Sequence, residues 1–440
     1  MATLKNKRGA SLLVYAIIGI IIAVVMLTFM VPIIGNFLDE FPVIKGAVVN
    51  PQDLVCFGGG KDNSVHCLNK LTGLEIFTFE KANSRNWKSG AFSTPVLRQE
   101  GLYFAVGNHV CAYGSGGSLW DNCMQISGIV TTDLEVDDNF VCFGTSVNQY
   151  VCLERSYGAL AFTIEAGWSD CPGDKCKTQV KPTLSEDFLY TALGNKICKY
   201  NKFSLHGNVE DNLGLWGNCP QFINNIESGI EVKDGLVCFG AGKDNFVSCV
   251  KDKGADVTQV FKSIKTGLAQ SKPHIEDSIV YFALDSELQK WQSLVDDADI
   301  LTRALAAEVP TDLAVSDDLI CFGGADKINC REKDTLINRF FIGAPKSEDS
   351  TYKWDFHEAI STPKFSNNYL YFGLGDHVCA YDAQALNDAA PLTPGNVVYL
   401  PETDINEDNK EWYIRERWCA DFNYQIPTGM AALEQEGASE

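Results

Sequence analysis

The chain has 440 residues, of which 45% are hydrophobic, and a formal net charge of −21. Its length suits two or three ordinary domains or one large closed β fold, and its hydrophobic content suits a packed core. The acidity argues against nucleic-acid binding, which needs a basic surface to neutralise phosphates, and favours a role in solubility.

The N-terminal segment joins a basic start to a long apolar run. Residues 1–9 form a basic leader, and residues 10–38 carry no charge. As a helix, this run is long enough to cross a hydrocarbon core of about 30 Å. Basic residues before the run and acidic residues after it predict export of the rest of the chain. The simplest interpretation is a transmembrane signal anchor that is not cleaved.

The leader also resembles the class III leader of type IV pilins and related archaeal surface proteins. The string "KRGASLLVYAIIGIIIAV" carries this resemblance, which implies cleavage between Gly9 and Ala10, with Lys7 and Arg8 as the preceding charges. It also implies the head of a filament subunit. Two features depart from the pilin pattern. The fifth mature position is Val14 rather than Glu, and Pro42 ends the helix soon after the membrane.

A repeat of about 45 residues, a period typical of solenoids and propellers, occupies residues 43–425. Units containing strings such as "VCFGGGKDNSVHC" alternate with units resembling "GLYFAVGNHVCAYG". Each unit is predicted to form four strands, and "KGAVV" is the expected first strand of the first unit. The repeats predict an all-β, eight-bladed β-propeller behind the N-terminal transmembrane helix. Residues 426–440 are expected to form an acidic flexible tail.

The repeats resemble those of the quinoprotein-like (PQQ-repeat) propellers. The string "CLNKLTGLEIFTFE" keeps the family's Thr72 and Gly73, with Phe77 where the family has Trp, and "YGALAFTIE" keeps Gly158 and Phe162. A dehydrogenase of this family would hold its quinone over a calcium ion in the central channel, often capped by a disulfide between adjacent cysteines. The sequence has no Cys-Cys dipeptide. We therefore expect the fold without the cofactor.

The 16 cysteines follow the repeat. In odd units, two cysteines flank the turn between the second and third strands, where antiparallel partners lie about 4.5 Å apart between Cα atoms. In even units, the pair is shifted to the third and fourth strands. The predicted disulfides are Cys56–Cys67, Cys111–Cys123, Cys142–Cys152, Cys171–Cys176, Cys198–Cys219, Cys238–Cys249, Cys321–Cys330 and Cys379–Cys419. The alternative is a zinc site, but only Cys171 and Cys176 have suitable spacing and they lack a second pair.

Three tryptophans occupy the same place in the repeat, before the first strand of an even unit: Trp87, Trp168 and Trp354. Such loops emerge on one face of a propeller. The tryptophans either form a binding rim for a glycan or protein, or each covers the edge of its own blade.

Other polar residues suggest two further sites. Four residues directly precede the prolines of the innermost strands and either line the channel or are simply solvated: Thr94, Lys181, Lys272 and Thr362. The string "DINEDNKE" has the oxygen spacing of half a calcium loop at Asp404, Asn406 and Asp408, although a solvated acidic insertion is the alternative. His109 and His377 hold matching positions in the repeat, which makes them repeat features rather than ligands.

These patterns together predict a single-pass, membrane-anchored propeller in the extracellular space or periplasm. Its predicted role is non-enzymatic binding, adhesion or scaffolding, with a protein or glycan partner at one propeller face. Association of copies into a filament is the further expectation from the pilin-like leader. The alternatives are a PQQ-dependent quinoprotein dehydrogenase and an envelope-assembly scaffold.

Overall fold

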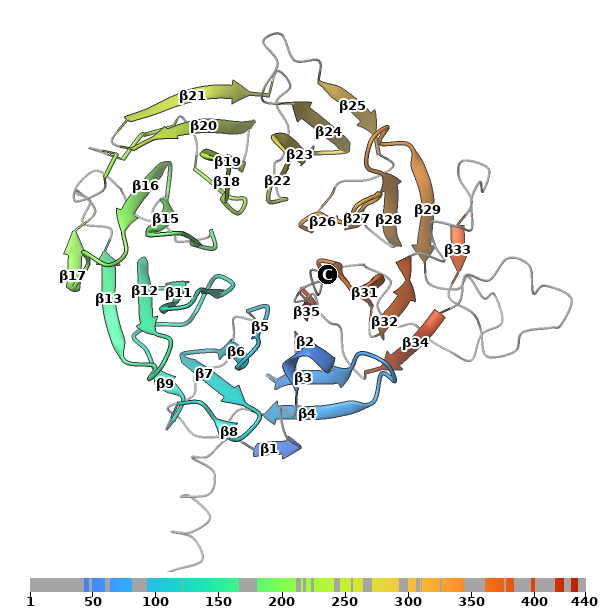
Figure 1. Ribbon diagram of the computed structural model, residues 1–440, viewed down its shortest axis with the longest axis horizontal. Coiled ribbons are helices and arrows are strands. Elements are labelled where there is room, and N and C mark those ends of the chain that lie inside the picture. The colour runs from blue at the N-terminus through green and yellow to red at the C-terminus, as the bar shows by residue number, and fades with distance from the viewer. Residues whose placement is uncertain are drawn as a thin grey trace, which may run out of the picture.

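Eight sheets are arranged radially around a central axis, which confirms the predicted eight-bladed propeller (Figure 1). The computed structural model describes residues 43–46, 50–59, 64–80, 93–120, 122–165, 180–210, 215–216, 219–222, 225–240, 246–254, 256–263, 271–292, 300–305, 309, 311–324, 327–343, 361–375, 377–383, 397–399, 416–422 and 429–433. Within these ranges, no helix has the length and hydropathy needed to span a membrane. The predicted leader and apolar helix lie outside them.

The blades are numbered 1 to 8 along the chain, and the strands of each are connected from the channel outwards. Blade 1 contains the 3-10 helix η1 (Pro51–Asp53), β2 (Leu54–Gly58), β3 (Ser64–Asn69) and β4 (Glu75–Glu80), and blade 3 contains β10 (Glu135–Val136), β11 (Phe140–Thr145), β12 (Gln149–Glu154) and β13 (Leu160–Glu165). Blade 5 contains β18 (Glu231–Lys233), β19 (Leu236–Gly240), β20 (Val247–Lys253) and β21 (Asp256–Lys262). Blade 7 contains β26 (Ala314–Val315), β27 (Leu319–Gly323), β28 (Lys327–Glu332) and β29 (Asn338–Gly343).

The even blades have the same plan. Blade 2 contains β5 (Val96–Arg98), β6 (Gly101–Val106), β7 (His109–Gly114), β8 (Gly117–Ser118) and β9 (Met124–Gln125), and blade 4 contains β14 (Thr183–Ser185), β15 (Phe188–Leu193) and β16 (Lys196–Asn201). Blade 6 contains β22 (His274–Glu276), β23 (Ile279–Leu284), β24 (Glu287–Gln292) and β25 (Leu301–Ala304). Blade 8 contains β30 (Lys364–Ser366), β31 (Tyr369–Leu374), β32 (His377–Asp382) and β34 (Glu416–Asp421).

The two ends of the propeller meet in blade 1, which corrects two predicted boundaries. The innermost strand of this blade is β35 (Ala431–Ala432), which pairs with β2, although the sequence placed these residues in the acidic tail. The strand β1 (Val43–Gly46) instead pairs with β4 at the outer edge, so "KGAVV" does not provide the first strand of the blade. Pairing β35 with β2 closes the ring, because it covers the inner edge that blade 1 would otherwise expose.

Blades 1, 3 and 7 each carry a fifth strand on their outer edge. β17 (Gly207–Glu210) arrives from blade 4 and pairs in parallel with β13, and β33 (Val397–Tyr399) arrives from blade 8 and pairs in parallel with β29. In blade 1, β1 lies at the same outer edge, where it pairs with β4 in the antiparallel direction. Figure 1 shows all three on the rim of the wheel.

Seven of the predicted disulfides are formed, with Cα–Cα distances between 4.1 and 4.7 Å. In the odd blades they join register partners on the second and third strands, and in the even blades they brace the third strand against the segment outside it. Blade 6 has no cystine at this place; Gln289 of its third strand pairs instead with Thr302. The predicted Cys171–Cys176 pair lies outside the described residues.

Two kinds of blade interface alternate around the wheel. Where an odd blade meets the following even blade, cystine sulfur and aromatic rings share one buried cluster. Between blades 1 and 2, for example, Cys56, Cys67 and Cys111 are fully buried together with Phe79 and Phe104, whose ring centroids are 4.8 Å apart. At three of the four interfaces where an even blade meets the following odd blade, a tryptophan takes the place of the cystines. The true structural repeat is therefore a pair of blades.

Tryptophans of the even blades dock onto a turn of the next blade. The Nε1–H of Trp120 donates to the carbonyl of Arg155 at 2.8 Å, and the ring packs against Gly158. Gly158 has a φ of +69°, and a Cβ at this position would lie 2.5 Å from the ring. Trp418 repeats the arrangement at Gly73 across the closing interface. The sequence pattern identified both glycines but not the tryptophans that pack on them.

The two other interfaces between an even blade and the following odd blade have a different contact in place of tryptophan on glycine. Between blades 4 and 5, Trp216 donates to Asp252, which also binds Lys199 and Tyr190 at 2.7 Å each. Burial raises the pKa of Asp252, but the hydrogen bonds from Lys199 and Tyr190 hold that pKa below its ordinary value. Between blades 6 and 7, Leu336 occupies the glycine position, and its fully buried side chain joins the hydrophobic cluster of this interface.

We expect Gly158→Ala to destabilise the propeller by about 3 kcal/mol, because the methyl group meets the Trp120 ring and the left-handed backbone disfavours alanine. Gly254→Ala is the matched control: its φ is +82°, but no atom lies within 4 Å of the added Cβ. The control should lose only about 1 kcal/mol. Denaturant unfolding of the non-reduced proteins measures both, and equal losses would contradict the docking role of the tryptophan.

Candidate functional site

A cavity of about 340 Å³ opens at one end of the central channel. One residue per blade stands two positions before each innermost strand: Thr94, Asp133, Lys181, Gly229, Lys272, Asp312, Thr362 and Gly429. All of these except Gly229 line the cavity. The structure thus confirms that Lys181, Lys272 and the two threonines line the channel. Asp133 and Asp312 were not predicted as channel residues, although the repeated string "TDL" marks both.

Polar contacts join each blade to the next at this level. The N–H of Gly429 in blade 1 donates to Thr94 Oγ1 in blade 2 at 3.0 Å. The N–H of Thr94 donates to Asp133 Oδ1 in blade 3 at 2.6 Å. Lys181 of blade 4 forms an ion pair with Glu135 of blade 3, with 2.6 Å between Nζ and Oε2. The first four blades are therefore linked in series.

The series continues through blades 5, 6 and 7. Thr183 of blade 4 donates its hydroxyl to the carbonyl of Ile230 in blade 5 at 2.6 Å. Glu231 of blade 5 forms an ion pair with Lys272 of blade 6. The backbone N–H of Lys272 then donates to Asp312 Oδ1 in blade 7 at 2.7 Å.

Blade 8 completes the circle. The N–H of Asp312 donates to Thr362 Oγ1 at 3.3 Å, and the N–H of Met430 in blade 1 donates to the carbonyl of Thr362 at 3.2 Å. Every blade boundary is thus crossed by at least one of these contacts, which we call the channel belt. Its last links depend on residues 429–430, directly before β35.

Burial controls the charges of the belt. It raises the pKa of Asp133, and the nearby charge of Asp312 raises it further, while Lys181 acts in the opposite direction. For Lys272, burial lowers the pKa, but the carboxylates of Glu231, Glu135 and Asp312 together raise it above its ordinary value, so the side chain stays charged. Burial also lowers the pKa of His274, so this side chain is neutral at pH 7.

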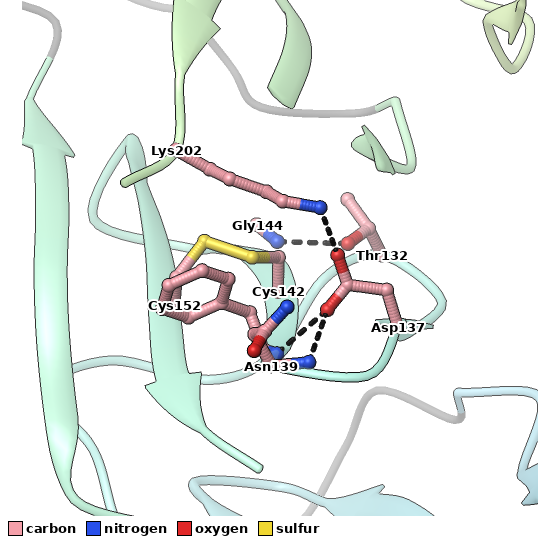
Figure 2. Close-up of a disulfide and its surroundings, with 8 residues drawn as sticks. Thr132, Asp137, Asn139, Cys142, Gly144, Cys152 and Lys202 are labelled. Carbon is pink, nitrogen blue, oxygen red and sulfur yellow. Dashed lines mark hydrogen bonds and ion pairs between the residues drawn. A yellow bond between two sulfur atoms is a disulfide. The ribbon is translucent and has the colours of Figure 1, made fainter. Parts of the chain in front are cut away.

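A second set of hydroxyls fixes the belt to the blades. The residue directly before a belt residue is serine or threonine in several blades, and its oxygen accepts the N–H of the residue twelve positions further along, on the second strand. The pairs are Ser93–Ala105, Thr132–Gly144, Ser228–Gly240, Thr311–Gly323 and Ser361–Gly373. Figure 2 shows the pair Thr132–Gly144 beside the Cys142–Cys152 disulfide. Because this spacing is constant, the sequence does carry a signal for these pairs, although none of them was predicted.

Figure 2 also shows a contact at the opposite end of blade 3, where this blade is joined to blade 4. Asp137, in the turn after β10, accepts N–H groups of Asn139 and Phe140 through Oδ1 at 2.8 and 2.7 Å. Its other oxygen binds Lys202 Nζ of blade 4 at 2.6 Å. The disulfide therefore lies between two polar links, one at each end of the sheet.

The carboxylates beside the channel take part in contacts between blades. Asp133 and Asp312 each accept a backbone N–H of a neighbouring blade, and Glu135 and Glu231 each neutralise a lysine. In the part of the chain that the structure describes, no three His, Cys, Asp or Glu side chains gather as a metal site would require. One oxygen of each of these four carboxylates thus helps to hold the ring together.

Several predicted site residues lie outside the described residues. These are the leader residues Arg8, Gly9 and Ala10, the tryptophans Trp87, Trp168 and Trp354, and the calcium candidates Asp404, Asn406 and Asp408. His109 and His377 begin the third strands of blades 2 and 8, as repeat positions should. His109 is buried, which lowers its pKa to about 4.

Comparison with known proteins shows the fold alone. No protein-family profile matches the sequence, and no curated protein matches it. Among solved structures, dihydro-heme d1 dehydrogenase NirN has a TM-score of 0.59 at 12% identity over 88% of this chain and 79% of its own. BamB from Moraxella catarrhalis has a TM-score of 0.50 at 14% identity over 66% and 82%, respectively. The computationally designed Ika8 protein has a TM-score of 0.53 at 14% identity over 76% and 88%.

We expect Asp133→Asn to stabilise the protein at pH 7 by about 1 kcal/mol, because the amide oxygen still accepts the Thr94 N–H without a buried charge. The raised pKa means that folded Asp133 binds a proton more readily than unfolded Asp133, so wild-type stability falls as the pH rises above the ordinary value of 3.8. The advantage of the variant should therefore vanish below pH 3.8. Unfolding curves across this range measure it.

The control for this prediction is Asp133→Ala, which leaves the Thr94 N–H without its acceptor. It should lose about 1–3 kcal/mol at every pH. An asparagine variant less stable than wild type at pH 7 would contradict the view that the charge itself is costly.

Proposed function

We propose that this protein is a rigid extracytoplasmic scaffold that binds a protein or glycan partner at one propeller face and performs no catalysis. The observation that supports this function is the channel belt. A catalytic acid or base must exchange a proton with its substrate. In the belt, the acidic and basic side chains are instead bound to one another across blade boundaries, which favours a mechanical role for the channel.

The disulfides support the proposed location. Seven bridges among the described residues indicate an oxidising compartment, either extracellular or periplasmic. We propose in addition that residues 10–38 anchor the propeller in a membrane. The first described strand, β1, lies at the outer edge of blade 1, so the chain joins the wheel from its rim.

The proposed binding face is the one at which the innermost strands begin. Because each blade alternates in strand direction, the outermost strand of a blade ends at the same face at which the next innermost strand starts. The chain between β4 and β5, between β13 and β14, and between β29 and β30 therefore leaves and re-enters at this face. These three connections contain Trp87, Trp168 and Trp354.

Replacing Trp87, Trp168 and Trp354 together with alanine should reduce retention of the partner from native surface extracts at least tenfold, because buried aromatic anchors contribute about 2 kcal/mol or more each. The matched control replaces Leu71, Tyr157 and Ile337 with alanine. These side chains are 58%, 76% and 47% exposed and lie in the turns between the third and fourth strands, at the opposite face. Quantitative pull-down with the full chain compares the variants.

Equal loss in both variants would contradict the choice of face. The dehydrogenase alternative is tested separately, by titrating the full chain with the quinone in the presence of calcium. Saturable binding there would contradict the non-enzymatic proposal.

The pilin-like leader predicts a mature chain that starts at Ala10, because the peptidase of this pathway cuts after the glycine. Mass spectrometry of the native N-terminus should find Ala10 first, and Gly9→Val should retain the leader. A native chain that starts at Met1 would contradict processing and leave a plain signal anchor.

A further inference from the structure

The chain joins the wheel at the end of blade 1 that belongs to the proposed binding face. β4 ends at this face with Glu80, and the register pairs Glu80 with Val43, the first residue of β1. β1 then runs towards the opposite face and ends at Gly46, beside Phe77. We propose that the binding face is turned towards the membrane, so that its partner is a protein of the same membrane. This inference rests on the proposed anchor and the proposed binding face.

The length of chain before β1 limits the position of the wheel. Only four residues, 39–42, separate the proposed anchor, residues 10–38, from Val43. Even fully extended, this linker reaches at most about 18 Å. β4 has six residues and is itself about 20 Å long. To bring the opposite face to the lipid, the linker would have to run back along all of β4, which exceeds its reach. The connectivity therefore favours a binding face turned towards the membrane.

The opposite face is acidic around the channel. In each of blades 2 to 7, the turn between the first and second strands lies at this face and carries an exposed acidic residue. These residues are Glu100, Asp138, Asp187, Asp234, Asp277 and Asp318. The same six turns contain no lysine or arginine. We call these six acidic residues the acidic ring.

The turns at the binding face are less charged. They join the second and third strands, and in blades 1 to 5 none has a net charge: Lys61 is balanced by Asp62, Lys243 by Asp244, and the others are neutral. A carboxylate loses hydration as it approaches hydrocarbon, and anionic lipids repel it. Both effects keep the acidic ring away from a lipid surface. Charge thus favours the same orientation as the connectivity.

This orientation defines the partner of the binding face. The connections that contain the three tryptophans start at β4, β13 and β29, which lie in separate parts of the wheel (Figure 1). A partner that contacts all three needs the dimensions of a protein rather than those of a single sugar. Because the binding face looks onto the lipid, such a protein reaches it most directly from the membrane itself.

Energy transfer to the membrane tests the orientation. The full chain with one added cysteine is labelled with a donor dye, without reduction, and reconstituted in phosphatidylcholine vesicles that contain acceptor-labelled lipid. Val147→Cys places the donor at the binding face of blade 3, and Tyr157→Cys is the matched control at the opposite face of the same blade. The two side chains are 44% and 76% exposed. Transfer should be about twofold greater for Val147→Cys, because β12 separates the two turns by about 20 Å.

A second pair of variants distinguishes a level wheel from one that stands on its rim. Lys262→Cys and Lys253→Cys replace exposed residues at the binding and opposite ends of blade 5, which lies across the wheel from blade 1 (Figure 1). Transfer should again be greater for the binding-face variant, Lys262→Cys. A wheel standing on the rim of blade 1 would give equal transfer within each pair, which would overturn the inference. Unfolding curves confirm that each variant is folded.

The class of partner is tested in native membranes. The partner whose retention is lost in the tryptophan variant should remain in membranes washed at high pH, because this wash removes soluble and peripheral proteins. Recovery of that partner in the wash, or of a glycolipid in its place, would overturn its assignment as a membrane protein.

Flotation of the vesicles separates this inference from the proposals on which it rests. A chain that does not float with the vesicles contradicts the anchor, and the orientation with it. A chain that floats but transfers energy equally from both faces, or more from the opposite face, contradicts the orientation alone. Loss of the partner in the tryptophan variant does not depend on either result.

Discussion

Closure of the ring at blade 1 is the constraint on which the rest of the structure depends. β35 has only two residues, yet it covers the inner edge of β2 and places Gly429 and Met430 between blades 2 and 8. Behind it, Lys70 Nζ donates to the carbonyl of Leu433 at 2.6 Å. Without β35, the inner edge of β2 would lack a paired strand. The last described residues of the chain thus complete the first blade.

The channel belt links each blade to the next around the axis. Each of its members contacts a neighbouring blade, so displacement of one blade would break polar contacts on both sides. Buried charges are costly unless they are paired. The partly buried charges of the channel are paired with one another, since Lys181 meets Glu135 and Lys272 meets Glu231. This explanation accounts for the charged channel without invoking a reaction.

The alternation of blades has a packing origin. An odd blade presents its cystine to the following even blade, and an even blade presents a tryptophan to the following odd blade. The two contacts need different residues on the two faces of each sheet. A single repeat unit therefore cannot serve every position. Blade 6 has no such tryptophan, and the buried Leu336 of blade 7 occupies this interface instead.

Local sequence signals determined the number of blades and the strand pairing within them. They also determined five of the seven disulfides, because two cysteines about ten residues apart across a turn lie on adjacent strands, whereas Cys198–Cys219 and Cys379–Cys419 followed from their matching places in the repeat. Lys181, Lys272, Thr94 and Thr362 were also placed correctly in the channel, since their position before a repeated proline is a local feature. For Trp120 and Trp418, the sequence showed the glycine turns but not that the indole comes from the neighbouring blade.

Tertiary structure alone decided the closure and the edges. Two alanines near the end of the chain carry no strand signal, so β35 is defined only by the open edge of β2, at the opposite end of the repeat series. The short strands β1, β17 and β33 are likewise set by the blade that each one covers. The sequence by itself specified the sheets, because their pairing is local. Only the folded ring decided which edges are covered and which charges meet, because those contacts join residues distant along the chain.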